Sequence, residues 1–149
     1  MTQIRPLTAA DHDAWLPLWR GYLAFYEAEL SAEQTALTWS RLTDPGYPIW
    51  GAFATDDAGH AIGFVHWLTH PATWSDRPYC YLEDLFVAPA TRGSGAGRGL
   101  IAHVTAWAGE NDCAKVYWLT HETNATARVL YDRVATRTGF IHYETGVGR

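Results

Sequence analysis

A strand, a glycine-rich loop and a helix follow one another between residues 78 and 108, and this run constrains the fold more than any other part of the chain. The segment PYCYLEDLFV is rich in the aromatic and aliphatic residues that favour a β-strand. After the breaker APAT, residues 92–99 read RGSGAGRG, with four glycines in eight residues. Apolar residues then recur at helical spacing, which predicts a helix from about Gly97 to Ala108. A glycine loop between a strand and a helix is a frequent phosphate-binding arrangement.

The loop fits one of three phosphate-binding patterns. A Walker A loop, GxxxxGK[ST], requires a lysine, and this stretch has none. The dinucleotide fingerprint GxGxxG fails because Arg98 or Leu100 stands where its last glycine belongs. The pattern RxxGxG is satisfied by Arg92, Gly95 and Gly97, and its glycines let backbone N–H groups approach an anion. Taken alone, so short a pattern fits a glycine-rich turn without a ligand equally well.

The remaining segments predict a mixed sheet with helices on both faces, within a single domain. We expect a strand at 2–7, helices from Asp11 and from Ser31 to Leu42, a hairpin made by PIWGAFAT and AIGFVHWLTH, a strand KVYWLT, a helix from Asn124 to about Ala135 and a final strand FIHYE. This order contains one strand–helix–strand crossover, at 78–119, beside a run of strands connected by hairpins.

Composition limits the partners that the chain is expected to have. A net charge of −5 does not favour nucleic acid. No apolar run reaches the length of a membrane span and no signal peptide is evident, so we expect a cytoplasmic protein without a membrane partner. Cys80 and Cys113 fit no metal-ligand spacing and are expected to be buried thiols. We expect no metal, because His66 and His70 lack a third ligand.

Two longer motifs place the loop in a family. The segment YLEDLFVAPATRGSGAGRGL resembles the acetyl-CoA-binding motif of the GCN5-related N-acetyltransferases (GNAT), and VYWLTHETNATARVLYDRV with Gly139–Phe140 resembles that family's second half. The resemblance covers residues 78–144. It implies an α/β (α+β) fold in one N-acetyltransferase domain, 1–149, with a central mixed sheet of six to seven strands. It also implies a cleft where strand 78–87, bulged near its end, splays from strand 115–120.

The resemblance further implies acetyl-CoA as the co-substrate. The pantetheine arm would bind the exposed backbone of Leu85, Phe86 and Val87, with Asn124 and Tyr131 near its reactive end. The pyrophosphate would lie on the glycine loop, made of Arg92, Gly93, Ser94, Gly95, Ala96, Gly97 and Arg98.

Acetyl transfer to an amine requires a group that accepts the proton of the amine. Glu83 and Asp84 are adjacent acids in an otherwise apolar strand, and on a regular strand only one would face the cleft unless a bulge intervenes. The plain alternative is a solvated or hydrogen-bonded charge. The segment YLEDLFV is similar to that of spermidine/spermine and thialysine acetyltransferases. This similarity implies that Glu83 relays the proton and that Asp84 contacts the cationic substrate.

Tyr131 is the candidate catalytic acid. It follows Asn124 by seven residues, so both lie on one helical stripe about 10 Å apart. A tyrosine here is commonly a core residue, but NATARVLY resembles the family pattern Asn-x-x-Ala-x-x-x-Tyr, which implies that its phenol protonates the leaving thiolate. Gly139 lies eight residues beyond Tyr131 instead of about four. That spacing is similar to a branch of yeast histone, polyamine and amino-acid acetyltransferases.

The sequence therefore predicts an acetyl-CoA-dependent N-acetyltransferase that works by direct transfer in a ternary complex. The expected acceptor is a small-molecule primary amine, such as a polyamine, a thialysine-like compound or another amino acid, and we expect a homodimer. Trp19 and Tyr26 are candidates to line the acceptor site, although aromatic residues at helical spacing are more often core. A lysine acetyltransferase acting on proteins and a non-catalytic acyl-CoA-binding module remain as alternatives.

Overall fold

The computed structural model describes residues 2–149, and the chain divides into two units after Leu119. The first unit contains the whole β-sheet and three α-helices. The second, from Thr120 to Arg149, contains one α-helix followed by a segment without helix or strand. The two units are described separately below.

The first unit is built on a five-stranded mixed sheet with the order β1-β2-β3-β4-β5. The strands are β1 (Gln3–Pro6), β2 (Ile49–Thr55), β3 (Ala61–His70), β4 (Tyr79–Val87) and β5 (Lys115–Tyr117). The first four pair antiparallel, and β5 is parallel to β4. This arrangement confirms the predicted hairpin and the mixed sheet.

The prediction of six to seven strands is wrong, because the described residues form a sheet of five strands. The segment FIHYE carries no strand in the described chain, and its Phe140 and Tyr143 are 83% and 84% exposed. Its apolar residues give it β-propensity, but propensity does not supply the neighbouring strand that a ladder needs. The strand expected at 115–120 also ends early, at Tyr117.

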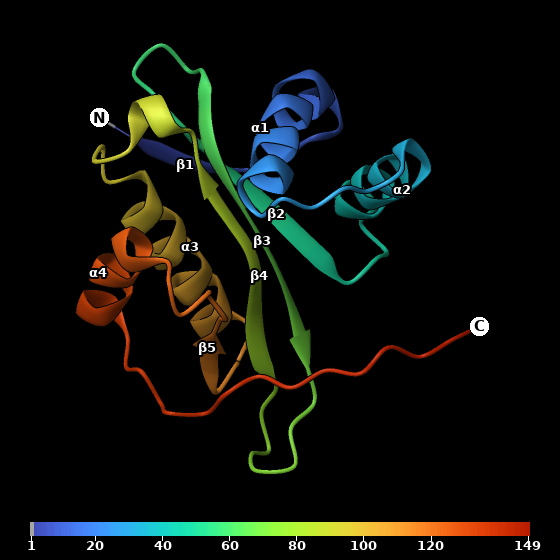
Figure 1. The fold of residues 1–149 in the computed structure, drawn as a ribbon, viewed down its shortest axis with the longest axis vertical. Coiled ribbons are helices and arrows are strands. Elements are labelled where there is room, and N and C mark those ends of the chain that lie inside the picture. Colours follow the sequence, from blue (N-terminus) through green and yellow to red (C-terminus); the bar gives the residue numbers. More distant parts are fainter. Residues whose placement is uncertain (1) are drawn as a thin grey trace. The chain divides into compact units, whose positions relative to one another are not determined.

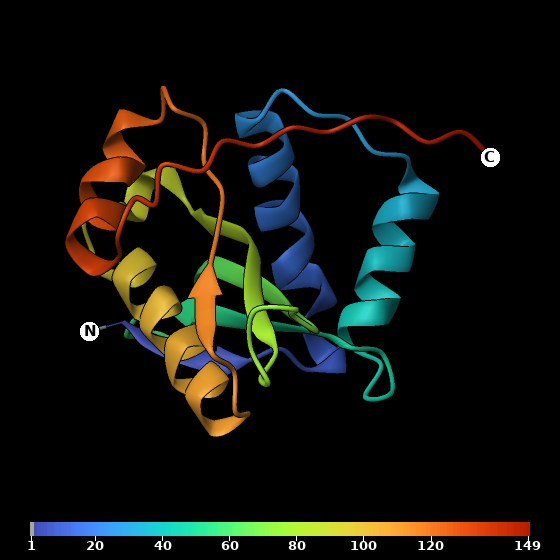
Figure 2. The same cartoon turned by 90° about the horizontal axis from the view of Figure 1, so that it is seen from below.

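The helical elements are η1 (Ala9–Asp11), α1 (His12–Phe25), α2 (Ala32–Leu42), η2 (Pro89–Thr91), α3 (Ala96–Glu110) and α4 (Ala125–Val134). In the first unit, α1 and α2 cover one face of the sheet and α3 covers the other (Figures 1 and 2). Helix α2 starts where the sequence predicts, because the Ser31 hydroxyl caps it by accepting a hydrogen bond from the Gln34 N–H at 3.0 Å.

Aromatic side chains dominate the core on the α1 face of the sheet. Trp15 and Trp19 of α1 stack with ring centroids 5.3 Å apart, over the buried Phe53 and Phe64 of the sheet. On the opposite face, Trp67 packs against Trp107 of α3, with ring centroids 5.6 Å apart. Burial of these large rings supplies much of the apolar area that stabilises a domain of this size.

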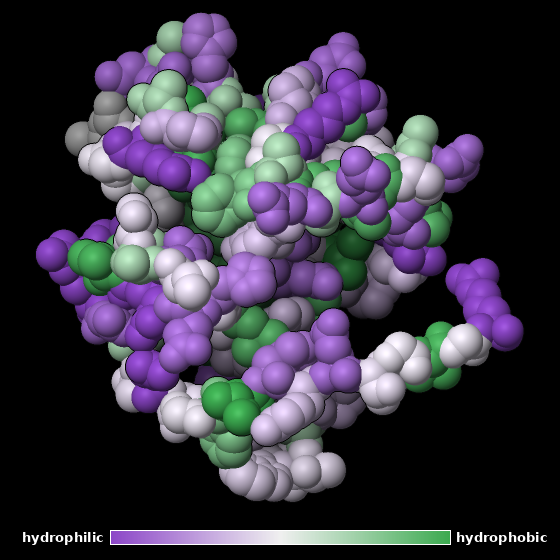
Figure 3. Space-filling view, viewed as in Figure 1, coloured by the Kyte–Doolittle hydropathy of each residue, from purple (hydrophilic) through white to green (hydrophobic). Residues whose placement is uncertain are grey.

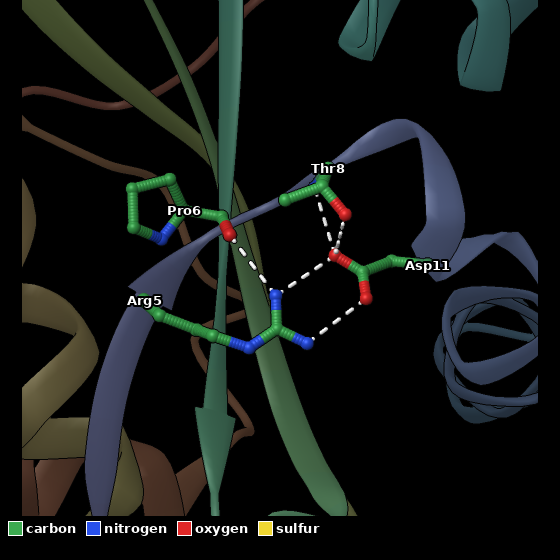
Figure 4. Close-up of polar contacts among 4 residues, drawn as sticks. All are labelled: Arg5, Pro6, Thr8 and Asp11. Carbon is green, nitrogen blue, oxygen red and sulfur yellow. Dashed lines mark hydrogen bonds and ion pairs between the residues drawn. The ribbon is translucent and has the colours of Figure 1, made fainter.

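A charged cluster joins β1 to the start of α1 (Figure 4). Arg5 donates to both carboxylate oxygens of Asp11, at 2.8 and 2.9 Å, and Asp11 also accepts from the Thr8 N–H at 2.7 Å. These bonds, led by that from Arg5, lower the pKa of Asp11 to about 2. The pair is therefore ionised at neutral pH and fixes the chain as it turns from the sheet into the helix.

Hydrophilic side chains cover most of the face drawn in Figure 3, and the apolar groups on it are scattered. Cys80 and Cys113 are free and buried, as predicted. Among the described residues, no helix has the length and apolar character needed to cross a membrane.

Candidate active site

A β-bulge places the two neighbouring acids of β4 on the same face of the sheet. His66 of β3 lies opposite Asp84, whereas the next residue, Trp67, lies opposite Leu82, so Glu83 is the extra residue of the bulge. His66 contacts aromatic rings of α1, and Trp67 contacts aromatic rings of α3. Because residues directly opposite each other share a face of the sheet, Asp84 lies on the α1 face and Leu82 on the α3 face. Side chains alternate between the two faces along a strand, so Glu83, the neighbour of Leu82, also points to the α1 face. The bulge therefore places both Glu83 and Asp84 on the α1 face.

Asp84 is held inside the molecule by two donors. Its Oδ1 accepts a hydrogen bond from the Tyr22 hydroxyl at 2.7 Å, and its Oδ2 lies 2.9 Å from His66 Nδ1. Its side chain is only 16% exposed. Both carboxylate oxygens are thus engaged by the protein, and contact of Asp84 with a cationic substrate stays a prediction.

Glu83, in contrast, is exposed to solvent. Protein atoms around its carboxyl group still remove enough water to raise its pKa, and the nearby negative charge of Asp84 raises it further. A carboxylate whose pKa lies above its ordinary value is a better proton acceptor near neutral pH. Of the two acids, Glu83 is the one that a molecule in solvent can reach.

Tyrosine hydroxyls surround the acid pair. Burial and the charge of Asp84 raise the pKa values of Tyr22 and Tyr26, and burial with the charge of Glu83 raises that of Tyr81. These phenols are therefore neutral hydrogen-bond donors at neutral pH. Tyr26, a predicted acceptor residue, is half-buried beside Tyr22, with ring centroids 5.1 Å apart. Trp19, the other such residue, lies in the core with 5% of its surface exposed.

The β4 edge that faces β5 is paired over only part of its length. The parallel ladder runs from Tyr79 opposite Lys115 to Tyr81 opposite Tyr117 and ends there. Within the described chain, the β5 side of residues 82–87 therefore has no strand partner. This early end of the ladder matches the separation of the two strands that the sequence led us to expect.

The pairing of β4 with β3 shows which backbone groups point toward this open edge. The Ala88 N–H donates to the Ile62 carbonyl at 2.8 Å, so this pair is a hydrogen-bonded one. Because such pairs alternate in an antiparallel ladder, Phe86 also bonds to β3, whereas Leu85 and Val87 turn their backbone groups the other way. Of the three residues predicted to hold pantetheine, Leu85 and Val87 present both N–H and C=O to the open edge.

The glycine loop has the backbone geometry of an anion cradle. Gly93 and Gly95 adopt positive φ angles of 86° and 85°, and an added Cβ at either would meet nothing within 4 Å. Gly95 is the N-cap of α3, and the first intrahelical bond runs from Gly99 N–H to Gly95 C=O. The N–H groups of Gly97 and Arg98 thus belong to the first turn, where the helix offers them no partner and its dipole favours an anion.

The side chains of the loop add cationic and hydroxyl groups. Arg92 is exposed and lies over the Phe25 ring, with its guanidinium carbon 5.5 Å from the centroid. The Ser94 hydroxyl accepts from the Ala96 N–H at 3.4 Å, and Arg98 is exposed. The residues predicted to hold pyrophosphate span the turn at 92–95 and the first turn of α3, and among them Ala96 alone is buried.

Replacing Gly95 by alanine is expected to raise KM for acetyl-CoA about tenfold, because the positive φ costs a non-glycine residue about 1–2 kcal/mol and the loop must shift to relieve it. Steady-state kinetics with varied acetyl-CoA would measure this change. Gly59→Ala is the matched control, since Gly59 has a φ of 84° and equally open surroundings in the β2–β3 turn. An equal rise of KM in both variants would contradict a role of the loop in binding.

In the second unit, α4 carries Asn124 and Tyr131. Asn124 is the N-cap residue, which confirms that the helix begins here, and its carbonyl accepts from the Arg128 N–H at 3.1 Å. Its side-chain oxygen makes no capping hydrogen bond to the helix, and its amide nitrogen donates to the Thr120 hydroxyl at 3.3 Å. Tyr131 is half-buried in the last turns of α4, where its carbonyl accepts from the Ala135 N–H. Its role as the acid stays a prediction.

Two members of the site escaped the sequence analysis. From the sequence, no role was assigned to Tyr22, and His66 was considered only as a metal ligand. Only the strand register brings His66 opposite Asp84, and only the packing of α1 brings the Tyr22 hydroxyl to the same carboxylate. Among the described residues, no three His, Cys, Asp or Glu side chains form a group that could hold a metal ion.

This combination of a splayed sheet edge, a glycine loop before a helix and an acid pair defines a class of protein. Residues 13–135 match the model of the acetyltransferase (GNAT) family, and the chain belongs to that family. It is an acetyl-CoA-dependent N-acetyltransferase of the GNAT type.

Relatives support this assignment. The chain is 36% identical over 142 residues to the D-amino-acid N-acetyltransferase HPA3 of Saccharomyces cerevisiae, covering 95% of this chain and 88% of that protein. It is 31% identical over 144 residues to the uncharacterized N-acetyltransferase YhfO of Bacillus subtilis, covering 94% of each. Among solved structures, AAC(6')-Iy in complex with a bisubstrate analogue, CoA-S-monomethyl-acetylneamine, shares the fold with a TM-score of 0.84, at 19% identity over 99% of both chains.

Proposed function

We propose that this enzyme transfers the acetyl group of acetyl-CoA to the primary amine of a small cationic molecule, by direct attack in a ternary complex. The observation that carries the proposal is the bulge, which brings Glu83 and Asp84 to one face with only Glu83 exposed. The similarity to a D-amino-acid N-acetyltransferase makes amino acids, beside polyamines and thialysine-like compounds, the first acceptors to consider.

The residues of the first unit supply the binding and the proton route. The N–H groups of Gly97 and Arg98, with the Arg92 guanidinium, would hold the pyrophosphate. The outward backbone groups of Leu85 and Val87 would hold the pantetheine arm, and one of their N–H groups would polarise the thioester oxygen. Glu83 would then have acetyl-CoA at the open edge of β4 and the acceptor on the α1 face.

The chemistry needs two proton transfers. A primary ammonium has a pKa near 10.4, so its deprotonation at neutral pH costs about 4 to 5 kcal/mol without help. Glu83 would take this proton directly or through water, and the amine nitrogen would bond to the thioester carbon. As the C–S bond breaks, Tyr131 would donate its phenolic proton to the sulfur, while Asn124 would hydrogen-bond the pantetheine arm.

The test is thiol release from acetyl-CoA with a panel of acceptors: polyamines, D- and L-amino acids, an aminoglycoside and a lysine-bearing peptide. We expect turnover with at least one small amine and a far lower kcat/KM with the peptide. Turnover of the peptide alone would replace the proposal by protein acetylation. Binding of acetyl-CoA without any turnover would favour the binding module. The homodimer and the cytoplasmic location stay predictions from the sequence.

A further inference from the structure

His66 sits under α1 at the centre of a chain of polar contacts. It is 4% exposed, and its Nε2 accepts a hydrogen bond from Trp15 Nε1 at 3.1 Å, while its Nδ1 lies 2.9 Å from Asp84 Oδ2. An indole N–H can only donate, so Nε2 must be the unprotonated nitrogen. The proton of the neutral ring is then on Nδ1 and is donated to Asp84. Trp15 thereby selects one tautomer of His66.

Helix α1 holds Asp84 at both of its oxygens. Trp15 acts through His66 on Oδ2, and Tyr22, seven residues further along the same helix, donates directly to Oδ1. Two hydrogen bonds, one to each oxygen, hold the Asp84 carboxylate in one orientation. Asp84 is therefore fixed in place on the face that also carries Glu83.

We propose that His66 is a positioning residue for acetyl transfer: held as its Nδ1–H tautomer by Trp15, it donates to Asp84 and fixes the orientation of that carboxylate, so that the exposed Glu83 is the acid that receives the amine proton. The inference rests on the proposed function for the identity of the acceptor. Repulsion from Asp84 is one of the causes that raise the pKa of Glu83. This agrees with Glu83 as the proton acceptor and Asp84 as its fixed neighbour. Loss of the bond from His66 would let Asp84 turn, and the proton acceptor would lose its fixed neighbour.

Two substitutions of His66 separate positioning from packing. His66→Asn puts an amide N–H near the place of Nδ1, where it can still donate to Asp84, but it loses the partner of Trp15. His66→Gln puts its amide near the place of Nε2, so Trp15 keeps a partner and Asp84 Oδ2 loses its donor. Glutamine is also closer to histidine in size. Positioning therefore predicts that Asn is the better substitute, whereas packing alone predicts Gln.

We expect His66→Gln to lower kcat/KM roughly 10- to 100-fold, the loss typical of a hydrogen bond to a charged group, and His66→Asn to keep most of the activity. Trp15→Phe should lower activity as well, because it frees the tautomer. Its matched control is Trp107→Phe, which removes a similar indole that packs against Trp67 on the opposite face of the sheet. An order with Gln above Asn would overturn the proposal.

A spectroscopic measurement keeps the proposal testable even if a variant fails to fold. Nitrogen-15 NMR of the wild-type enzyme should show His66 as a neutral ring with Nδ1 protonated and Nε2 bare. A ring protonated on Nε2, or an imidazolium at neutral pH, would refute the inference. This readout needs no acceptor, so it is independent of the proposed function. Activity with a peptide but with no small amine would contradict the proposed acetylation of small amines and would leave the tautomer result unaffected.

Discussion

Tyr131→Phe is expected to lower kcat for acetyl transfer by about 10²- to 10⁴-fold, the usual contribution of a positioned acid, with little change in the affinity for acetyl-CoA. The variant loses only the phenolic O–H, and the ring continues to fill its half-buried place on α4. Without that proton, the leaving group is a bare thiolate, and the tetrahedral adduct returns to the thioester more often than it proceeds. Stopped-flow and steady-state measurement of thiol release would give kcat, and calorimetry would give the affinity.

The control for this substitution lies in the same unit of the chain. Tyr143→Phe removes an identical hydroxyl from a side chain that is 84% exposed, and it should leave both kcat and affinity unchanged. If Tyr131→Phe weakened acetyl-CoA binding as much as it lowered kcat, Tyr131 would be a packing residue. A full kcat in the variant would move the protonation of the thiolate to another group or to water.

Much of the fold could be predicted because its signals are local. The β2–β3 hairpin follows from DDAGH, since Asp56 Oδ1 accepts from the N–H groups of Ala58 and His60, and Gly59 takes the positive φ that the turn needs. The N-cap Ser31 gave the start of α2 for the same reason. The number of strands could not be predicted this way, because the fate of FIHYE depends on a neighbouring strand and not on its own residues.

The same distinction between local signals and contacts with a neighbouring strand applies to the site. The glycine loop was predictable, since positive φ angles at Gly93 and Gly95 and a helix start are properties of a few consecutive residues. The resemblance implied a bulge near the end of strand 78–87, but the faces of Glu83 and Asp84 could not be predicted, because they depend on which residue is the extra one. That position is set by the register between two strands. For this reason the sequence could predict an acid pair but could not say which acid meets solvent.

Glu83→Gln should abolish the proton route while keeping the shape of the site, and we expect kcat/KM at neutral pH to fall by about 10²- to 10³-fold. In the wild type, activity falls as the pH drops through the raised pKa of Glu83, because the carboxylate must be ionised to accept the proton. In the variant this dependence disappears. The rate should instead follow the fraction of free amine and rise with pH toward about 10.

The pH profile therefore separates a base from a mere binding charge. The matched control is Glu33→Gln, which removes the same charge from an exposed position in the first turn of α2 and should leave the profile unchanged. If Glu83 only attracted the cationic acceptor, its substitution would raise KM, leave kcat intact and keep the acidic limb where it is. If the variant instead recovers at alkaline pH, where the amine no longer needs a base, Glu83 is the proton acceptor and Asp84 is its fixed neighbour.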